Sequence, residues 1–200
     1  MILLQAPILT AILVDNMYLQ HASTIFNVGP LDPRKFPKAF LRQPPEEHFR
    51  TFIFDALPYV PDFGATEKHK EYRAKKDSYL KAIQYYEKIA VELGDVRPKS
   101  AHCPKCNANF TVPVQKLVDV KISVRLVALG TTGIVKKIVL VAGDKDLLPA
   151  VDAIKDTATT VRLAYVAEQD VQTSKDLIRA CPEKQKLEQP DIASCRFDKP

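Results

Sequence analysis

Short apolar runs rich in β-branched residues alternate along this sequence with longer segments of helical spacing. The runs lack strict apolar/polar alternation, as expected for strands that are covered on both faces. They are Ile8–Val14, Thr51–Phe54, Lys137–Val141 and Val161–Val166. Strands and helices that alternate in this way build a parallel sheet with helices on both faces. We therefore predict an α/β, Rossmann-like fold in one domain.

Four segments between and after these strands have apolar residues at helical intervals. The predicted helices are Glu67–Leu93, which Gly94 would end, Val118–Leu129, Asp146–Ile154 and Ser174–Ala180. The helix Val118–Leu129 is apolar nearly all round and is expected in the interior. The proline-rich segment 30–45 predicts an irregular connection, and the polar chain from Pro182 onward predicts a loosely attached tail.

The 200 residues suffice for one domain with a small appendage. We expect the domain to span residues 1–187, with residues 95–115 inserted as a β-ribbon that carries a Cys-x-x-Cys tip. Residues 188–200 would form the C-terminal tail.

Composition excludes several protein classes. Hydrophobic residues make up 46% and charged residues 26%, as in soluble globular proteins, and the net charge of +5 is a weak indication of a polyanionic partner. The longest apolar stretch is far shorter than the roughly 20 residues that span a bilayer, so no membrane anchor is expected. Four cysteines do not make a disulfide scaffold, and Met1–Thr10 lacks the basic region of a secretion signal, so a reducing cytoplasmic setting is expected.

Four aspartates fall where ligands bind in parallel sheets, beyond the carboxyl ends of the strands. Asp15 follows the first strand, Asp144 and Asp146 follow the strand Lys137–Val141, and Asp119 begins an apolar helix. Converging carboxylates repel one another unless a cation lies between them, and oxygen ligands favour Mg²⁺ or Mn²⁺. Such an ion supports phosphodiester hydrolysis. The alternative is structural, with Asp146 capping the following helix and Asp15 and Asp144 as loop residues.

Four motifs occur together, in the order seen in NYN-domain proteins of the LabA-like group, which have the PIN-like nuclease fold. They are Ala11-Ile-Leu-Val-Asp15-Asn16, Phe54-Asp-Ala-Leu-Pro-Tyr59, Lys116-Leu-Val-Asp-Val120 and Val141-Ala-Gly-Asp-Lys-Asp-Leu-Leu-Pro149. The sequence resembles that family over roughly Ile8 to Leu187. The resemblance implies a metal-dependent ribonuclease in which Asp15, Asp119 and Asp144 hold Mg²⁺ or Mn²⁺ and Asp146 completes the catalytic set. It also implies that Asn16 and Lys116 contact the substrate.

One position departs from the family pattern. Members commonly carry a second Asp six residues after the one matched by Asp119, and Arg125 stands there. Arg125 would either neutralise a substrate phosphate at the rim of the pocket or pair with another acid. The alternative function is therefore a catalytically weakened, nucleic-acid-binding or regulatory module. A nucleotide-binding protein is disfavoured because no Gly-rich loop follows the first strand.

Cysteines and lysines suggest two further sites. His102-Cys103-Pro-Lys-Cys106 is half of a zinc-knuckle pattern, which Cys181 and Cys195 or a homodimer could complete; the alternative is reduced free thiols. A run of cations that includes Lys75 and Lys76 occupies the front of the helix from Glu67. It forms either a solvated face or a grip for RNA phosphates. The interleaved Tyr72 and Tyr79 are expected to pack into the core.

Overall fold

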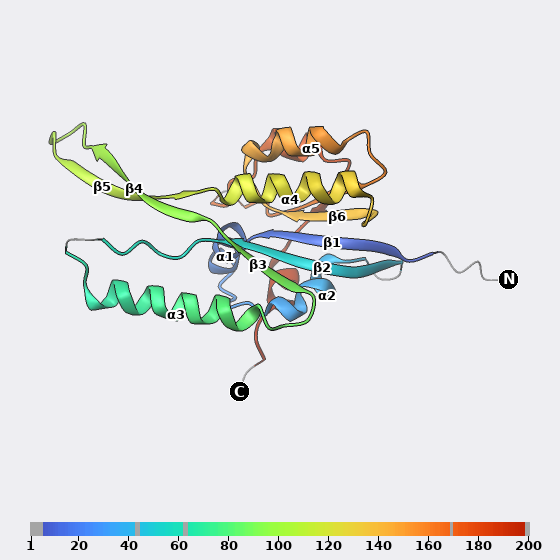
Figure 1. The fold of residues 1–200 in the computed structure, drawn as a ribbon, viewed down its shortest axis with the longest axis horizontal. Coiled ribbons are helices and arrows are strands. Elements are labelled where there is room, and N and C mark those ends of the chain that lie inside the picture. Colours follow the sequence, from blue (N-terminus) through green and yellow to red (C-terminus); the bar gives the residue numbers. More distant parts are fainter. Residues whose placement is uncertain (1–5, 43–44, 62–63, 169, 199–200) are drawn as a thin grey trace.

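A computed structural model of the chain describes residues 6–42, 45–61, 64–168 and 170–198. Its centre is a six-stranded parallel sheet, which confirms the α/β prediction (Figure 1). The strands are β1 (Ile8–Asp15), β2 (Glu46–Asp55), β3 (Ile89–Leu93), β6 (Lys137–Val141), β7 (Thr160–Tyr165) and β8 (Glu183–Lys186). Their order across the sheet is β3-β2-β1-β6-β7-β8. A separate antiparallel ribbon of β4 (Asp95–His102) and β5 (Asn109–Lys116) confirms the predicted insertion.

Helices cover both faces of the sheet, and each face has its own hydrophobic core. On one face lie α1 (Asn16–Ile25), α2 (Phe36–Phe40), α3 (Glu67–Ile83) and α7 (Gln189–Ser194). On the other lie α4 (Val118–Thr132), α5 (Leu148–Ile154) and α6 (Lys175–Ala180). The central strands β1 and β6 are fully covered, which explains why their sequences are continuously apolar.

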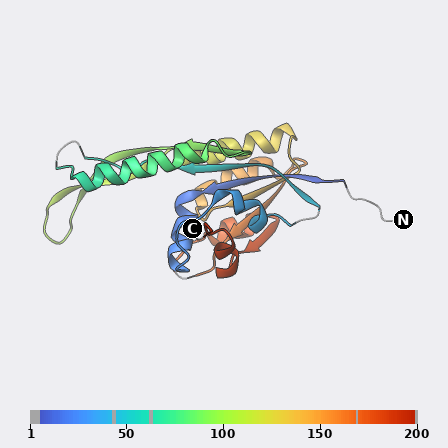
Figure 2. The ribbon, with the colours of Figure 1, turned by 90° about the horizontal axis from the view of Figure 1, so that it is seen from below.

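Figures 1 and 2 show two arms that extend past the carboxyl ends of the strands. One arm is the ribbon β4–β5, and the other is the first half of α3, whose residues 67–75 are all exposed. Because both arms extend past the carboxyl ends of the strands, they flank any ligand that binds at that end of the sheet.

The predicted helix Glu67–Leu93 is wrong in its second half. Helix α3 ends at Ile83, Lys88 turns the chain with a φ of 59°, and β3 follows at the edge of the sheet, paired with β2. Gly94 does not end a helix. A Cβ there would lie 2.6 Å from the carbonyl oxygen of Lys116, so glycine permits the ribbon to close tightly on the end of β3.

Three other expectations also need correction. The segment after Pro182 is not loosely attached, because it forms β8 and α7 and buries Ile192 and Cys195. The proline-rich segment 30–45 contains a 3₁₀ turn (Pro33–Lys35) and α2, although Gln43 and Pro44 lie outside the described residues. Helix α4 is not interior on every side, because Val120 and Val124 are 56% and 63% exposed.

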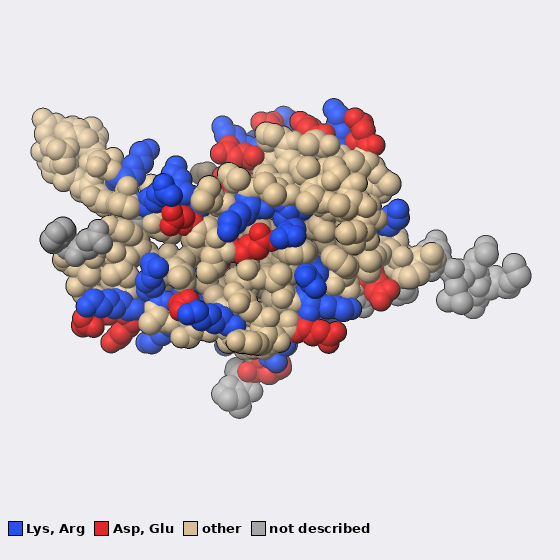
Figure 3. All heavy atoms as spheres, viewed as in Figure 1, with Lys and Arg blue, Asp and Glu red and all other residues tan. Residues whose placement is uncertain are grey.

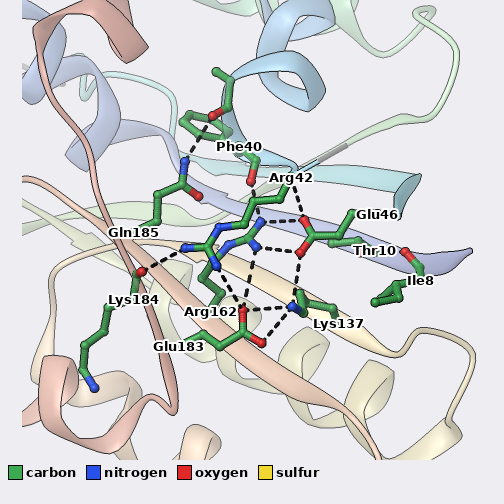
Figure 4. A network of polar contacts seen from close by, with 11 residues as sticks. Ile8, Thr10, Phe40, Arg42, Glu46, Lys137, Arg162, Glu183, Lys184 and Gln185 are labelled. Atoms are coloured by element: carbon green, nitrogen blue, oxygen red, sulfur yellow. Dashed lines mark hydrogen bonds and ion pairs between the residues drawn. The ribbon is translucent and has the colours of Figure 1, made fainter. Parts of the chain in front are cut away.

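A buried ionic network joins the amino-terminal ends of the strands, opposite the arms (Figure 4). Arg162 on β7 is fully buried, and its guanidinium donates to both carboxylate oxygens of Glu46 at 2.6 and 2.8 Å. It also donates to the carbonyl oxygen of Phe40 at 2.6 Å. Lys137 lies 3.1 Å from Glu46 and 2.7 Å from Glu183. Burial alone would raise the pKa of Glu46, but hydrogen bonds led by Arg162 hold it at about 2.

Candidate functional site

The candidate site lies where the chain changes from one face of the sheet to the other. β1 leads into α1 on one face, whereas the neighbouring β6 leads to α5 on the other. A crevice forms at the carboxyl ends of two such strands, and it is where open α/β sheets bind their ligands. Asp15 is the last residue of β1 and Asp144 lies just beyond β6, so the structure places both carboxylates at this point.

Asp15 has a structural contact as well as a place in the site. It is the N-cap of α1, and its Oδ1 accepts hydrogen bonds from the backbone N–H groups of Met17 at 3.0 Å and Tyr18 at 3.2 Å. Burial raises the pKa of Asp15 to about 6, against the lowering effect of the Tyr18 N–H, and repulsion from Asp119 and Asp55 adds to the rise. Its negative charge is therefore destabilised by its surroundings.

Asp119 faces the acids that follow β6. It lies in the first turn of α4 and is half-buried. Burial raises its pKa first, followed by repulsion from Asp144 and then Asp146. Asp146 does not cap α5, and Asp144 instead caps the 3₁₀ turn Lys145–Leu147 that leads into it, because Asp144 Oδ1 accepts from the Asp146 N–H at 2.9 Å. Asp144 and Asp146 are exposed and accessible to a ligand.

Asp55 is an acid of this site that the sequence analysis did not select. It ends β2 and is 2% exposed, and its carboxylate accepts from Asn16 Nδ2 and, at 2.7 Å, from Lys76 Nζ. The signal was present, since Asp55 follows its strand as Asp15 does. Asn16, which was expected to contact substrate, and Lys76, which was expected on a solvated face or in a grip for phosphates, both contact Asp55. The Lys76 charge thereby offsets one of the clustered carboxylates.

A groove of about 1310 Å³ opens beside Asp15 and Asp144, between α1 and the loop after β7. That loop is fixed by Tyr18, whose hydroxyl lies 2.8 Å from Thr173 Oγ1 and accepts the Val166 N–H at 2.8 Å. Gly143 makes this packing feasible, because a Cβ there would lie 2.6 Å from the Tyr18 ring. The groove therefore extends from the carboxylates across the ends of β1, β6 and β7.

The two arms place cations near the carboxyl ends of the strands, where the acids lie. Exposed cations are Lys68, Lys70, Arg73 and Lys75 on α3 and Arg97, Lys99, Lys105 and Lys116 on the ribbon, against the three acids Glu67, Glu71 and Asp95. Figure 3 shows basic side chains on both arms. Tyr72 on α3 is 61% exposed, contrary to the expectation that it packs in the core, and Phe110 on the ribbon is 48% exposed. Tyr79 does pack against the core.

Arg125 is held by neighbours on the sheet. Its guanidinium lies 2.7 Å from the carboxylate of Glu92 on β3 and stacks 4.7 Å from the centre of the Phe52 ring. Of the two alternatives for this residue, the structure shows pairing with an acid.

The junction between the ribbon and α4 is strained. Leu117 has a φ of 69°, in the left-handed region that costs a side-chain-bearing residue about 1–2 kcal/mol. Because Leu117 is 48% exposed, its side chain contributes little packing. Leu117→Gly is therefore expected to raise the free energy of unfolding by about 0.5–1 kcal/mol, measured by urea denaturation, after the entropic cost of glycine is subtracted. A lower stability of Leu117→Gly than of the wild type would contradict this account.

The carboxylates suit a divalent cation in the way Mg²⁺ is usually bound, through one or two carboxylates with water as the other ligands. Their donors are all oxygen, and a cation would offset both the burial of these charges and the repulsion between them, which together raise the pKa of Asp15 and Asp119. Within the part of the chain that the structure describes, no three His, Cys, Asp or Glu side chains enclose an ion by themselves.

The cysteines do not converge on one site. Cys103 and Cys106 lie at the tip of the ribbon. Cys181 and Cys195 are fully buried in the separate cores on opposite faces of the sheet. The proposal that these two buried thiols complete a zinc site within one chain is therefore wrong.

Comparisons with known proteins identify the family. The sequence matches the NYN domain over residues 10–188. A crystal structure of a protein of unknown function from Vibrio parahaemolyticus has a similar fold, with a TM-score of 0.54 and 16% identity over 92% of this chain and 95% of that one. No curated protein matches the sequence significantly. None of the helices described here is long and apolar enough to cross a membrane. The chain thus belongs to the NYN domain family, a PIN-like ribonuclease family whose nucleases typically use divalent metals.

Proposed function

We propose that this protein is a metal-dependent endoribonuclease whose active site is the acidic cluster between β1 and β6. The observation that carries the proposal is the meeting of Asp15, Asp119 and Asp144, from three separate elements, at the point where the sheet connections diverge. Burial raises the pKa of both Asp15 and Asp119, and repulsion from neighbouring acids adds to the rise. Clustered charges that destabilise one another and sit beside a groove are typical of functional sites.

Asp15, Asp119 and Asp144 would hold Mg²⁺ or Mn²⁺, one or two of them directly and the rest through bound water, with a substrate phosphate as a further ligand. The bound ion would polarise the phosphodiester and acidify an attacking water. Asp146, exposed and next to Asp144, is placed to orient that water. Lys76 and Asn16 fix Asp55 behind the cluster, so they position the site rather than contact RNA.

The arms would guide RNA to these acids. An anionic site admits a polyanion only when cations lie nearby, and both arms supply them at the edge that holds the cluster. Tyr72 and Phe110 add exposed aromatic rings on which unpaired bases can stack. The combination favours a single-stranded or locally unpaired RNA substrate.

The proposal is tested with labelled single-stranded RNA, structured RNA and DNA, each incubated with Mn²⁺ or with EDTA. We expect internal cleavage of single-stranded RNA that requires the metal and is lost in Asp144→Asn. Cleavage that survives both chelation and Asp144→Asn would overturn the assignment of the site. RNA binding without cleavage under any metal would instead favour the regulatory alternative.

A separate prediction concerns the arms. Lys75→Ala and Lys116→Ala should each weaken RNA binding and reduce the slope of log K against log salt by about 0.7, the value for one phosphate contact on a single strand. Both side chains are exposed, so stability should not change. Fluorescence anisotropy at several salt concentrations measures the slope. Lys155→Ala, at the far end of α5, is the matched control, and an equal loss in that variant would mean that the arms have no special role.

A further inference from the structure

The tip of the ribbon carries two thiols in a tight turn. Residues 103–108 connect β4 to β5. The Cys103 N–H donates to the Ala108 carbonyl at 2.9 Å, and the Asn107 N–H donates to the Cys103 carbonyl at 3.0 Å. Asn107 has a φ of 55°, which lets the chain reverse just after Cys106. The backbone therefore holds Cys103 and Cys106 at fixed places on one short turn.

Both thiols are open to an ion from solution. Cys106 is exposed and Cys103 is partly exposed. Two cysteines separated by two residues on one turn are a common half of a tetrahedral zinc site. Tetrahedral zinc, with Zn–S bonds of about 2.3 Å, needs sulfurs about 3.8 Å apart, a spacing that neighbouring thiols in one turn can adopt.

Two thiolates fill only half of a tetrahedral site. His102 is the adjacent residue, but its Nδ1 and Nε2 lie 3.0 Å from Asn109 and 3.2 Å from Asn107, so its ring is held by amides. Cys181 and Cys195 are buried in the two cores. No third His, Cys, Asp or Glu joins the pair among the residues described. A tetrahedral ion on this pair would therefore need two more ligands, and a second copy of this chain can supply them.

We infer that two copies of this protein join ribbon tip to ribbon tip and share one zinc ion through Cys103 and Cys106 of each. The ribbon extends away from the rest of the domain, so two tips can meet without collision of the sheets (Figure 1). A two-fold axis through the ion gives each copy the same contacts.

The charge of the zinc site also favours a second copy of this chain as the partner. Zinc with four thiolates carries a net charge of −2, which is costly unless cations or N–H donors lie nearby. Each tip brings Lys105 within the turn, so two copies supply two positive charges at the site. The ribbon has few buried residues of its own, and two-stranded hairpins are marginally stable in water. A shared ion would fix the tips of both ribbons.

The test uses the full chain, purified under reducing conditions without chelator. Zinc content is measured by elemental mass spectrometry, and molar mass by light scattering after gel filtration. We expect about 0.5 zinc per chain in a dimer, as one four-sulfur site between two chains requires. EDTA should yield monomers, and replacement of zinc by Co²⁺ should give the intense absorption of tetrahedral thiolate coordination.

Cys106→Ser should lose both the zinc and the dimer, whereas Lys99→Ser, a matched change on the same exposed ribbon, should keep both. Far-UV circular dichroism of Cys106→Ser should match that of the wild type, because the tip lies outside both cores. Absence of zinc, one zinc in each monomer, a dimer that survives EDTA, or a mass lower by about 2 Da from a Cys103–Cys106 disulfide would each overturn the inference.

Discussion

Asp15→Asn is expected to give a protein that is more stable at pH 7 and yet no longer cleaves RNA. Asn is as good an N-cap as Asp, so its side-chain oxygen keeps the hydrogen bonds from Met17 and Tyr18. The substitution removes a charge that burial and the neighbouring acids oppose. A rise of about two pKa units corresponds to about 3 kcal/mol, which sets the upper limit of the gain.

The pH dependence of this gain has a definite sign. The pKa of Asp15 is 3.8 when unperturbed and about 6 in the folded chain. A carboxyl whose pKa is raised on folding contributes its full stability below the lower value and loses it as the pH rises through the higher one. The stability difference between Asp15→Asn and wild type should therefore be small below pH 4, grow between pH 4 and 6, and stay constant above.

Activity should move in the opposite direction. Loss of a metal-holding carboxylate is expected to lower cleavage at least about 100-fold, equivalent to about 2.7 kcal/mol of transition-state stabilisation. Mn²⁺ should raise the melting temperature of the wild type and leave that of Asp15→Asn unchanged, since only a bound ligand stabilises the native state. Asp152→Asn, an exposed acid on α5, serves as control. A less stable Asp15→Asn, or one that retains full cleavage, would contradict the account of the site.

Arg162→Ala is expected to be the most destabilising single change in the molecule. The guanidinium is fully buried and holds Glu46, which is 5% exposed, through two hydrogen bonds. Removal of the guanidinium leaves a buried carboxylate with only Lys137 and the Arg42 N–H as partners, and loss of one partner of a buried pair costs about 3–5 kcal/mol. Domains of this size are stable by about 5–15 kcal/mol, so much of the total would be lost.

Denaturation in urea at pH 7 measures this loss. Glu183→Gln is the matched control, because Glu183 belongs to the same network but its side chain is 30% exposed, and about 1 kcal/mol or less is expected. The pKa of Glu46 is lowered from 4.5 to about 2, so its contribution is present above pH 4.5 and is lost as the pH falls toward 2. Glu46→Gln should lack that component of acid sensitivity. A cost below about 1 kcal/mol for Arg162→Ala would show that the network is dispensable.

The errors of the sequence analysis have physical causes. Residues Tyr86, Ile89 and Leu93 are spaced as on a helix, but β3 is only five residues long, and so short an apolar run has no period that separates strand from helix. Glu183–Lys186 is polar because β8 lies at the edge of the sheet, where one side is open to water. Local hydrophobicity underestimates such edge elements.

Arg162 was missed for a different reason. Its burial is explained by a partner distant in sequence, Glu46. An arginine inside the apolar run Val161–Val166 gives no indication that it will be fully buried. Only the pairing of β2 with β1, of β1 with β6 and of β6 with β7 brings its counter-ion within reach.

The sequence by itself determined the parallel α/β sheet, the inserted ribbon and the presence of Asp15 and Asp144 at strand ends, because strand patterning and the strand-end rule are local properties. Only the tertiary structure decided that α1 and α5 leave on opposite faces of the sheet, which places those carboxylates beside one groove and close to Asp119. It also decided that Arg125 pairs with Glu92 and that two basic arms flank the site. These features depend on contacts between segments far apart in the chain. No local sequence pattern determines the register of such segments or the face of the sheet on which they lie.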